Sequence, residues 1–286
     1  MIEPGQHRRW LSIVTLWGLL LVPSLGQGAV DGNKGPPNAV SCVGDPNLFA
    51  SPSHFLDTVR QDYEDLYLSP SHLTHLSAAF GAGAIMANTN IDSQTQEWYQ
   101  DHVRTKAGDR VSDVAKVFGA GQYLLPVSVA TALWGDRLHF GEGASPLATW
   151  GEHTTRAYLT GGPVLLATQW LTGGSRPTED DSHWRPFHDD NGVSGHAFIG
   201  AVPFLTAGRM CEENPLARYL LYAASTLPAL SRINDNAHYP SQAFLGWFLA
   251  WEATGAVAQR ERGDRHISVA PALIGDACGL ALCVRW

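Results

Sequence analysis

Residues 194–207 have the sequence SGHAFIGAVPFLTA, in which a Ser-Gly-His start leads into an apolar run with helical spacing. Further blocks with the same spacing are separated by Ser, Thr, Asp, Pro and Gly. These blocks are residues 55–68, 73–87, 109–134, 148–171, 215–227 and 239–260. The pattern predicts an all-α bundle of about six or seven helices, with a site at the end where loops and helix starts converge.

The tail of the chain departs from the helical pattern. Residues 266–273 and 278–286 alternate apolar residues with small or polar ones, as the two strands of a β-hairpin do. We therefore expect residues 53–262 to form a helical domain and residues 263–286 a small C-terminal β-hairpin. The side chains expected on one face of this hairpin are Leu280, Leu282, Val284 and Trp286.

The first 29 residues have the pattern of a signal peptide. A basic start at His7-Arg8-Arg9 precedes an apolar stretch over residues 10–22 and a zone of small residues suited to cleavage. An uncleaved membrane anchor is the alternative, but the apolar stretch is short of the ~20 residues that a span needs. We expect an exported, periplasmic or secreted protein, with residues 30–52 as an extended lead-in rich in Gly, Pro, Asn and Ser.

Charge and hydropathy narrow the class of partner. The formal net charge of -8 and the absence of a long basic run disfavour nucleic acid. The mean hydropathy of -0.11 disfavours a protein with several membrane spans, although contact with a membrane stays open. The oligomeric state also stays open, as does the pairing of the cysteines, which are too sparse for a disulfide framework. They are Cys42, Cys211, Cys278 and Cys283.

Three segments carry groups suited to a tetrahedral oxyanion. They are Gly174-Ser175-Arg176-Pro177, Ser194-Gly195-His196, and Ser231-Arg232 followed six residues later by His238. Each arginine offers paired N–H donors to phosphate oxygens, and the start of a helix offers unpaired backbone N–H groups. One imidazole can act as a nucleophile while the other donates a proton to a leaving alkoxide. Together the segments predict a phosphate site.

As an ordered set, these segments resemble the type 2 phosphatidic acid phosphatases, which share their site with bacterial class A acid phosphatases and vanadium-dependent haloperoxidases. The family pattern is Lys, six residues, Arg-Pro; then Pro-Ser-Gly-His; then Ser-Arg, five residues, His, three residues, Asp. The resemblance covers about residues 150–250 and implies a helical bundle of the same kind. It also implies phosphoryl transfer without a required cofactor, in which vanadate would bind as an inhibitor.

The resemblance assigns a role to each of the shared residues. His238 would attack phosphorus and carry a phosphohistidine, while His196 would protonate the leaving oxygen and later activate water. Charge stabilisation in a preorganised site would supply most of the rate. The groups that would hold the phosphate oxygens are Arg176, Arg232, Ser194, the amide of Gly195, and Gln169.

Three positions depart from the family pattern. Gln169 stands in place of Lys, so a neutral donor replaces a positive charge and should weaken binding of a dianion. Gln242 stands in place of the Asp that orients the nucleophile; its carbonyl can still accept the N–H of His238 and fix the tautomer, but it stabilises an imidazolium less well. Val193 replaces Pro in a loop and need not touch the chemistry.

The sequence therefore predicts a phosphatase that hydrolyses phosphate monoesters, lipid phosphates or lipid diphosphates, with the leaving group left open. A vanadium-dependent haloperoxidase, with vanadate as its cofactor, is one alternative, and Gln169 argues against it because the lysine charge is missing. A degenerate anion-binding protein is another, and the retention of both histidines and both arginines argues against that.

Other candidates carry less weight. Trp184-Arg185-Pro186 offers a competing frame for the first segment, but it leaves only six residues before Val193. His72 and His75, three apart on an expected helix, could ligate a metal, although a solvated or core-capping role is the simpler interpretation. The loop His188-Asp189-Asp190-Asn191 lacks the spaced oxygen ligands of a calcium site.

Overall fold

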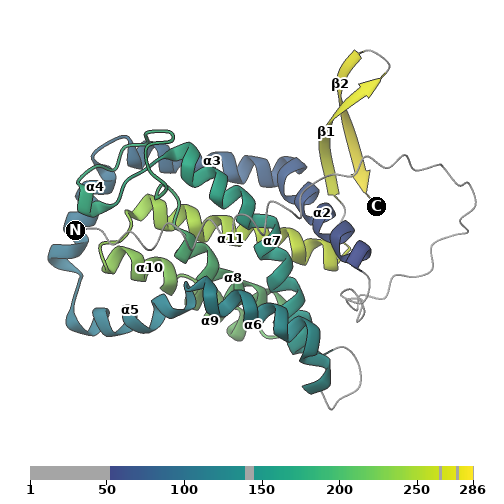
Figure 1. The fold of residues 1–286 in the computed structure, drawn as a ribbon, viewed down its shortest axis with the longest axis horizontal. Helices are drawn as coiled ribbons and strands as arrows, with labels where there is room; N and C mark the ends of the chain where they lie inside the picture. Colours follow the sequence, from purple (N-terminus) through teal and green to yellow (C-terminus); the bar gives the residue numbers. More distant parts are fainter. Residues whose placement is uncertain (1–51, 139–144, 264–265, 275–276, 286) are drawn as a thin grey trace, which may run out of the picture. The chain divides into compact units, whose positions relative to one another are not determined.

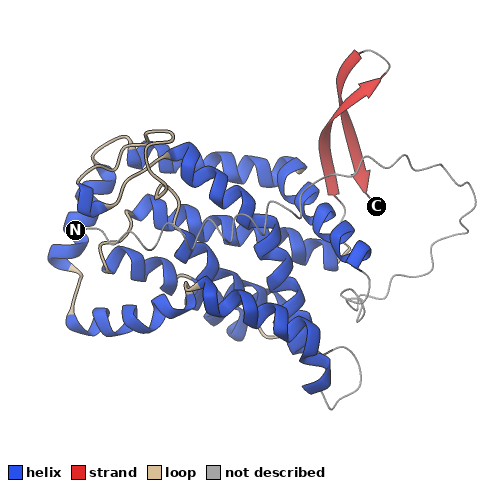
Figure 2. Cartoon of the chain, viewed as in Figure 1, coloured by secondary structure: helices blue, strands red, loops and turns tan. Residues whose placement is uncertain are grey.

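The computed structural model describes residues 52–138, 145–263, 266–274 and 277–285, with side chains described over residues 53–138 and 145–263. Most of this chain is helical (Figure 2). The α-helices are α2 (Pro52–Leu68), α3 (Pro70–Ala87), α4 (Ile91–His102), α5 (Lys106–Phe118), α6 (Gly121–Trp134), α7 (Pro146–Thr172), α8 (Gly195–Met210), α9 (Pro215–Ser225), α10 (Leu227–Asn234) and α11 (Pro240–Glu261). Two short 3₁₀ turns, η2 (Gly135–Leu138) and η3 (Pro177–Glu179), follow α6 and α7.

Helix α11 runs through the middle of the helices and packs against α3, α7 and α8 (Figure 1). Small side chains let it approach them closely. Gly246 of α11 faces the start of α8, where a Cβ would lie 2.2 Å from the carbonyl oxygen of Ser194. Gly161 of α7 faces the ring of Phe198 in the same way, at 2.7 Å. These approaches fix the N-terminal end of α8 against α7 and α11, which is where the predicted phosphate site begins.

The mostly helical character predicted from the sequence is confirmed, but the finer fold class is wrong. The bundle of about six or seven helices of the phosphatase kind is replaced by the longer series α2 to α11. The single block expected over residues 109–134 divides into α5 and α6 at Gly119, where a Cβ would lie 2.8 Å from the carbonyl oxygen of His196. Close contact with α8 thus ends α5 inside an otherwise continuous apolar pattern.

Helix α4 was not expected because its inward face is polar. Asp92 accepts hydrogen bonds from the backbone N–H and the hydroxyl of Ser241, at the start of α11. Gln96 donates to the carbonyl oxygen of Ile233 and to the side chain of Asn236. Periodicity of apolar residues cannot detect a helix that packs through hydrogen bonds. Helix α4 therefore supports the segment between α10 and α11 with polar contacts.

A buried network of charges joins α2, α7 and the end of α11. Arg156 of α7 is 1% exposed and donates to both carboxylate oxygens of Asp62, at 2.8 and 2.9 Å. It also donates to Glu152 and Glu261. Arg260 of α11 contacts the same Asp62. This network holds three helices together by paired charges.

In the tail, β1 (His266–Ile274) and β2 (Ala277–Arg285) pair antiparallel, with His266 opposite Arg285 and Ile274 opposite Ala277. Their side chains lie outside the described residues, so the shared apolar face stays a prediction. The predicted signal peptide over residues 1–29, the lead-in up to residue 51 and Cys42 also lie outside them. Among the cysteines whose side chains are described, Cys211 is free.

None of the described helices has, by itself, the length and apolar character needed to cross a membrane. Lys106–Phe118 and Gly121–Leu138, which meet at a bend of 49°, meet these two criteria only when they are taken together.

Candidate phosphate site

The three predicted segments lie on different elements. Arg176 follows α7 in the loop that precedes η3, Ser194 is the N-cap of α8, and Arg232 belongs to α10. His238 lies between α10 and α11, where the backbone N–H of His238 donates to the carbonyl oxygen of Arg232 at 3.2 Å. The third segment is therefore a turn that holds its arginine and its histidine together.

Gln242, in the first turn of α11, connects all three segments. Its Nε2 donates to the carbonyl oxygen of Ser175 at 2.7 Å. Its backbone carbonyl accepts from the N–H of Ser194 at 2.9 Å. Its Oε1 lies 3.0 Å from Nδ1 of His238 and accepts from the N–H of Tyr239 at 3.1 Å. A single buried residue, through its side chain and its backbone carbonyl, thus brings together segments that are far apart in the sequence.

These contacts also fix the tautomer of His238. The N–H of Tyr239 can only donate and the carbonyl of Ser175 can only accept, so the amide of Gln242 has one orientation. Oε1 then faces Nδ1 of His238, which must carry the proton and donate it. The neutral imidazole keeps an unprotonated Nε2, which is the atom that a nucleophilic histidine needs.

The start of α8 presents backbone donors. Ser194 is fully buried, and its hydroxyl accepts from the N–H of Ala197 at 3.3 Å as an N-cap. Within the described chain, the N–H groups of Gly195 and His196 have no protein acceptor. A helix N-terminus with unpaired N–H groups favours an anion. Ser194 thus shapes the helix start, and the two following amides are the donors that remain for a ligand.

Both arginines keep donors available. Arg232 is mostly buried; its Nη1 lies 3.7 Å from a carboxylate oxygen of Asp235, and its buried Nε has no hydrogen-bond partner among the described residues. A buried guanidinium N–H without a partner is costly, because folding removes its water and supplies no acceptor. Arg176 is exposed and donates from Nε to the side chain of Asn191 at 3.0 Å. An anion bound between the two arginines would accept hydrogen bonds from the free N–H groups of both side chains.

The charges of these arginines act on both histidines. Burial, together with the positive charges of Arg232 and Arg176, lowers the pKa of His196 to about 4. Burial, with the same arginines and His196 acting in the same direction, lowers the pKa of His238 to about 3, although its hydrogen bond to Oε1 of Gln242 acts to raise it. Both imidazoles are therefore neutral at pH 7 in the anion-free site.

Gln169 supports the loop rather than adding charge. Its Nε2 donates to the carbonyl oxygen of Val193 at 2.8 Å, and a Cβ on Gly195 would lie 3.5 Å from the same nitrogen. The amide therefore borders the helix start where the family pattern places a lysine. One N–H is used on the protein, and the second is left for a ligand.

Two features were missed from the sequence. Asn191, considered only within a calcium loop, positions Arg176, and its own amide N–H donates to Asp189. The carbonyl of Ser175 anchors Gln242, although Ser175 carried no signal except its place beside Arg176.

Arg185, the centre of the competing frame, is an exposed loop residue that pairs with Asp181 at 2.8 Å. The residues of the first segment that contribute to the site are therefore Ser175 and Arg176.

A search of protein-family models, of curated proteins and of solved structures gave no match to this chain. The geometry of the site is therefore the basis for assigning a function.

Proposed function

We propose that this chain is a phosphatase that hydrolyses phosphate monoesters or lipid phosphates through a phosphohistidine on His238. The observation that carries the proposal is the buried, unpaired Nε of Arg232, next to a histidine whose tautomer leaves Nε2 free to attack. The free amides of Gly195 and His196 add donors for the same anion. Because the sequence predicts a signal peptide, we propose that this reaction takes place outside the cytoplasm.

The proposed reaction has two transfers. The lone pair on Nε2 of His238 forms a bond to phosphorus as the bond to the leaving oxygen breaks, and His196 gives that oxygen a proton. His196 then takes a proton from water, which attacks the phosphohistidine and releases phosphate. Arg176 and Arg232 stabilise the charge on the phosphoryl oxygens in both steps.

In the proposed reaction, His196 must take up the proton that it donates when the substrate binds. The pKa of His196 is lowered to about 4 in the anion-free site, so it is mostly neutral near pH 7. A bound phosphate dianion offsets the charges of the two arginines and raises this pKa, because an opposite charge nearby favours the imidazolium. Substrate binding and protonation of His196 are therefore coupled.

The test uses the untagged protein with p-nitrophenyl phosphate. We expect hydrolysis, inhibition by vanadate, and a loss of turnover of at least about 10³-fold in His238→Ala, as expected when a nucleophile is removed. The matched control is His54→Ala on the exposed surface of α2, which should keep full activity. Quenching with base should trap phosphate on His238.

Three other results would decide against the proposal. Phosphate trapped on Ser194 would overturn the assignment of the nucleophile. Bromide-dependent consumption of peroxide without ester hydrolysis would favour the haloperoxidase. Vanadate binding without either activity would indicate a non-catalytic anion-binding protein. The presence of Gln169 and Gln242 in place of charged residues would agree with that outcome.

A further inference from the structure

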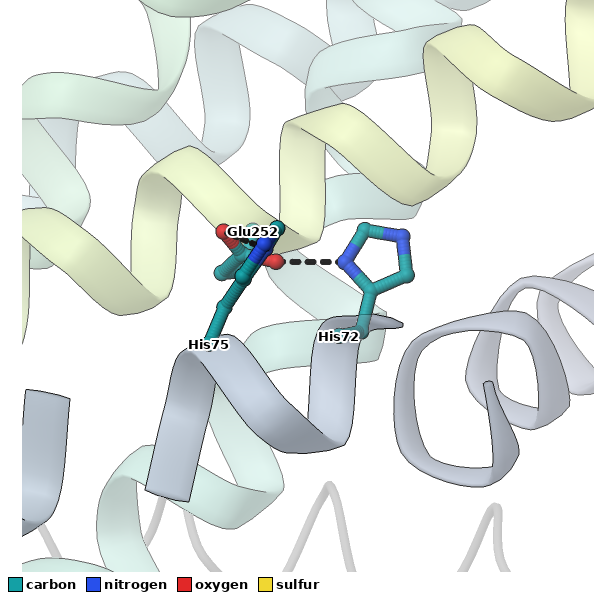
Figure 3. Close-up of side chains that lie close together, drawn as sticks. All are labelled: His72, His75 and Glu252. Carbon is teal, nitrogen blue, oxygen red and sulfur yellow. Dashed lines mark hydrogen bonds and ion pairs between the residues drawn. The ribbon is translucent and has the colours of Figure 1, made fainter. Parts of the chain in front are cut away.

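Away from the phosphate site, α3 and α11 place two imidazoles around one buried carboxylate (Figure 3). His72 and Glu252 are 4% and 3% exposed, and Nδ1 of His72 is hydrogen-bonded to Oε2 of Glu252. Nδ1 of His75, which is exposed, lies 3.4 Å from the other oxygen, Oε1. The three ligand-type atoms lie within 4.8 Å of one another.

His72 faces an oxygen on each side of its ring. Nδ1 faces the carboxylate of Glu252, and Nε2 lies 3.2 Å from Oε1 of Gln259. A neutral imidazole has only one N–H, so it cannot donate to both. A metal ion bound at Nδ1 fits both neighbours, because it can also bind the carboxylate and it leaves Nε2–H to donate to Gln259. Histidines that bind metals are usually oriented in this way by an acceptor on the second ring nitrogen.

We propose that His72, His75 and Glu252 form a binding site for a divalent transition metal ion such as Zn²⁺. Two imidazole nitrogens and one carboxylate oxygen suit zinc and its neighbours, whereas calcium and magnesium take oxygen ligands. Bond lengths of about 2.0–2.2 Å place tetrahedral ligand atoms about 3.4 Å apart, which matches the separation between His75 and Glu252. The exposed side of His75 leaves a fourth position for water.

Arg209, whose charge interacts with that of Glu252, does not form an ion pair with the carboxylate. Arg209 of α8 donates to the hydroxyl of Thr254 and to the carbonyl oxygen of Trp251, and its guanidinium lies 4.8 Å from the centre of the Trp251 ring. Within the described residues, the ion-pair partners of Glu252 are His72 and His75. The carboxylate therefore remains available to a metal ion.

The metal site is separate from the phosphate site. Glu252 follows Gln242 by ten residues on α11, which corresponds to about 15 Å along the helix axis. A metal ion there would tie α3 to α11 without touching His238. Its presence can therefore be tested independently of phosphatase activity.

The experiment titrates Co²⁺ into untagged full-length protein stripped of metal by a chelator, followed by displacement with Zn²⁺. We expect visible absorption that saturates at one Co²⁺ per chain, loss of that absorption with Zn²⁺, and a higher melting temperature. His75→Ala should weaken binding by more than about tenfold, since even groups that only hydrogen-bond to a metal ligand contribute that much. Because His75 is exposed, this change does not threaten folding.

His54→Ala serves as the control, because it removes an exposed imidazole from a different helix, and it should bind Co²⁺ as the unchanged protein does. Glu252→Gln keeps the shape of the side chain, and it should weaken binding as His75→Ala does. Saturable binding that survives both His75→Ala and Glu252→Gln would overturn the proposal. So would the absence of binding, which would leave an ion pair between His72 and Glu252 as the whole role of the cluster.

Discussion

At the residue scale, Gln242 combines two functions that no single carboxylate at its position can perform. As an acceptor it holds Nδ1–H of His238, and as a donor it binds the carbonyl of Ser175. An ionised Asp could do the first but would repel the carbonyl oxygen in the second, since it has no proton to donate. The glutamine thus joins the first segment to His238 and fixes the tautomer of its imidazole.

Substitution of Gln242 separates these functions. Gln242→Leu removes both contacts, so we expect kcat to fall by about 10–100-fold, the usual cost of losing an orienting partner, with a smaller change in KM. Gln242→Glu keeps the acceptor and should retain more activity than Gln242→Leu. Its negative charge raises the pKa of His238 from the low value set by burial, so the acidic limb of the rate profile should move to higher pH.

The measurement is kcat and KM for p-nitrophenyl phosphate from pH 3 to 8 in both variants. A leucine variant with unchanged kcat would show that Gln242 does not orient the nucleophile. A glutamate variant with an unchanged acidic limb would show that His238 is not the group that titrates there.

The sequence pointed to the side chains of the candidate site, but not to the contacts that hold them in place. Motif spacing singled out Arg176, His196, Arg232 and His238, because their side-chain chemistry is specific in itself. The contact between Ser175 and Gln242 could not be predicted, since any residue has a carbonyl and only the fold decides which one is reached. The unexpected helix α4 has the same origin, because its contacts use side-chain hydrogen bonds that leave no apolar period.

At the element scale, the break between α5 and α6 lies against the start of α8. Gly119 ends α5 against the start of α8, where a Cβ would lie 2.8 Å from the carbonyl oxygen of His196 and 2.9 Å from its ring. The backbone of Gly119 has φ -80° and ψ -6°, which any residue can adopt, so only the space demands glycine. The apolar pattern continues through this point and gives no sign of the break.

Gly119→Ala should therefore displace His196. We expect the added methyl group to cost about 1–3 kcal/mol of stability, as overpacking does, and to weaken vanadate binding. Gly81→Ala on α3 is the matched control, because no atom lies within 4 Å of the added group. That change should be neutral or stabilising by up to about 1 kcal/mol, since alanine favours a helix over glycine. Urea denaturation and vanadate titration measure the two effects; equal behaviour of the two variants would contradict the contact.

At the scale of the whole molecule, the charge network around Arg156 joins the end of α11 to α2 and α7. Burial raises the pKa of Glu152 to about 7, against the lowering effect of Arg156. The folded pKa lies above the ordinary value of 4.5, so the contribution of Glu152 to stability is complete below pH 4.5 and is lost as the pH rises through 7. His153, whose pKa burial lowers to about 4, contributes in the opposite sense, and that contribution is lost as the pH falls from 6.5 through 4.

Arg156→Met tests this network. It leaves the carboxylates of Asp62, Glu152 and Glu261 facing one another without their shared cation, and breaking a buried pair in this way costs about 3–5 kcal/mol. Without the arginine, Glu152 takes up a proton more readily, so neutralisation relieves the repulsion in mildly acidic solution. We therefore expect a larger loss of unfolding free energy at pH 8 than at pH 5.5.

Urea denaturation at the two pH values measures the difference, with Arg60→Met as the control. Arg60 pairs with Glu64 at 3.0 Å on the exposed side of α2, and such surface pairs contribute at most about 1 kcal/mol. A loss in Arg156→Met no larger than in Arg60→Met would mean that packing, rather than paired charge, holds α2 and α7 to α11. A loss that is large but equal at both pH values would mean that the charge of Glu152 does not contribute to it.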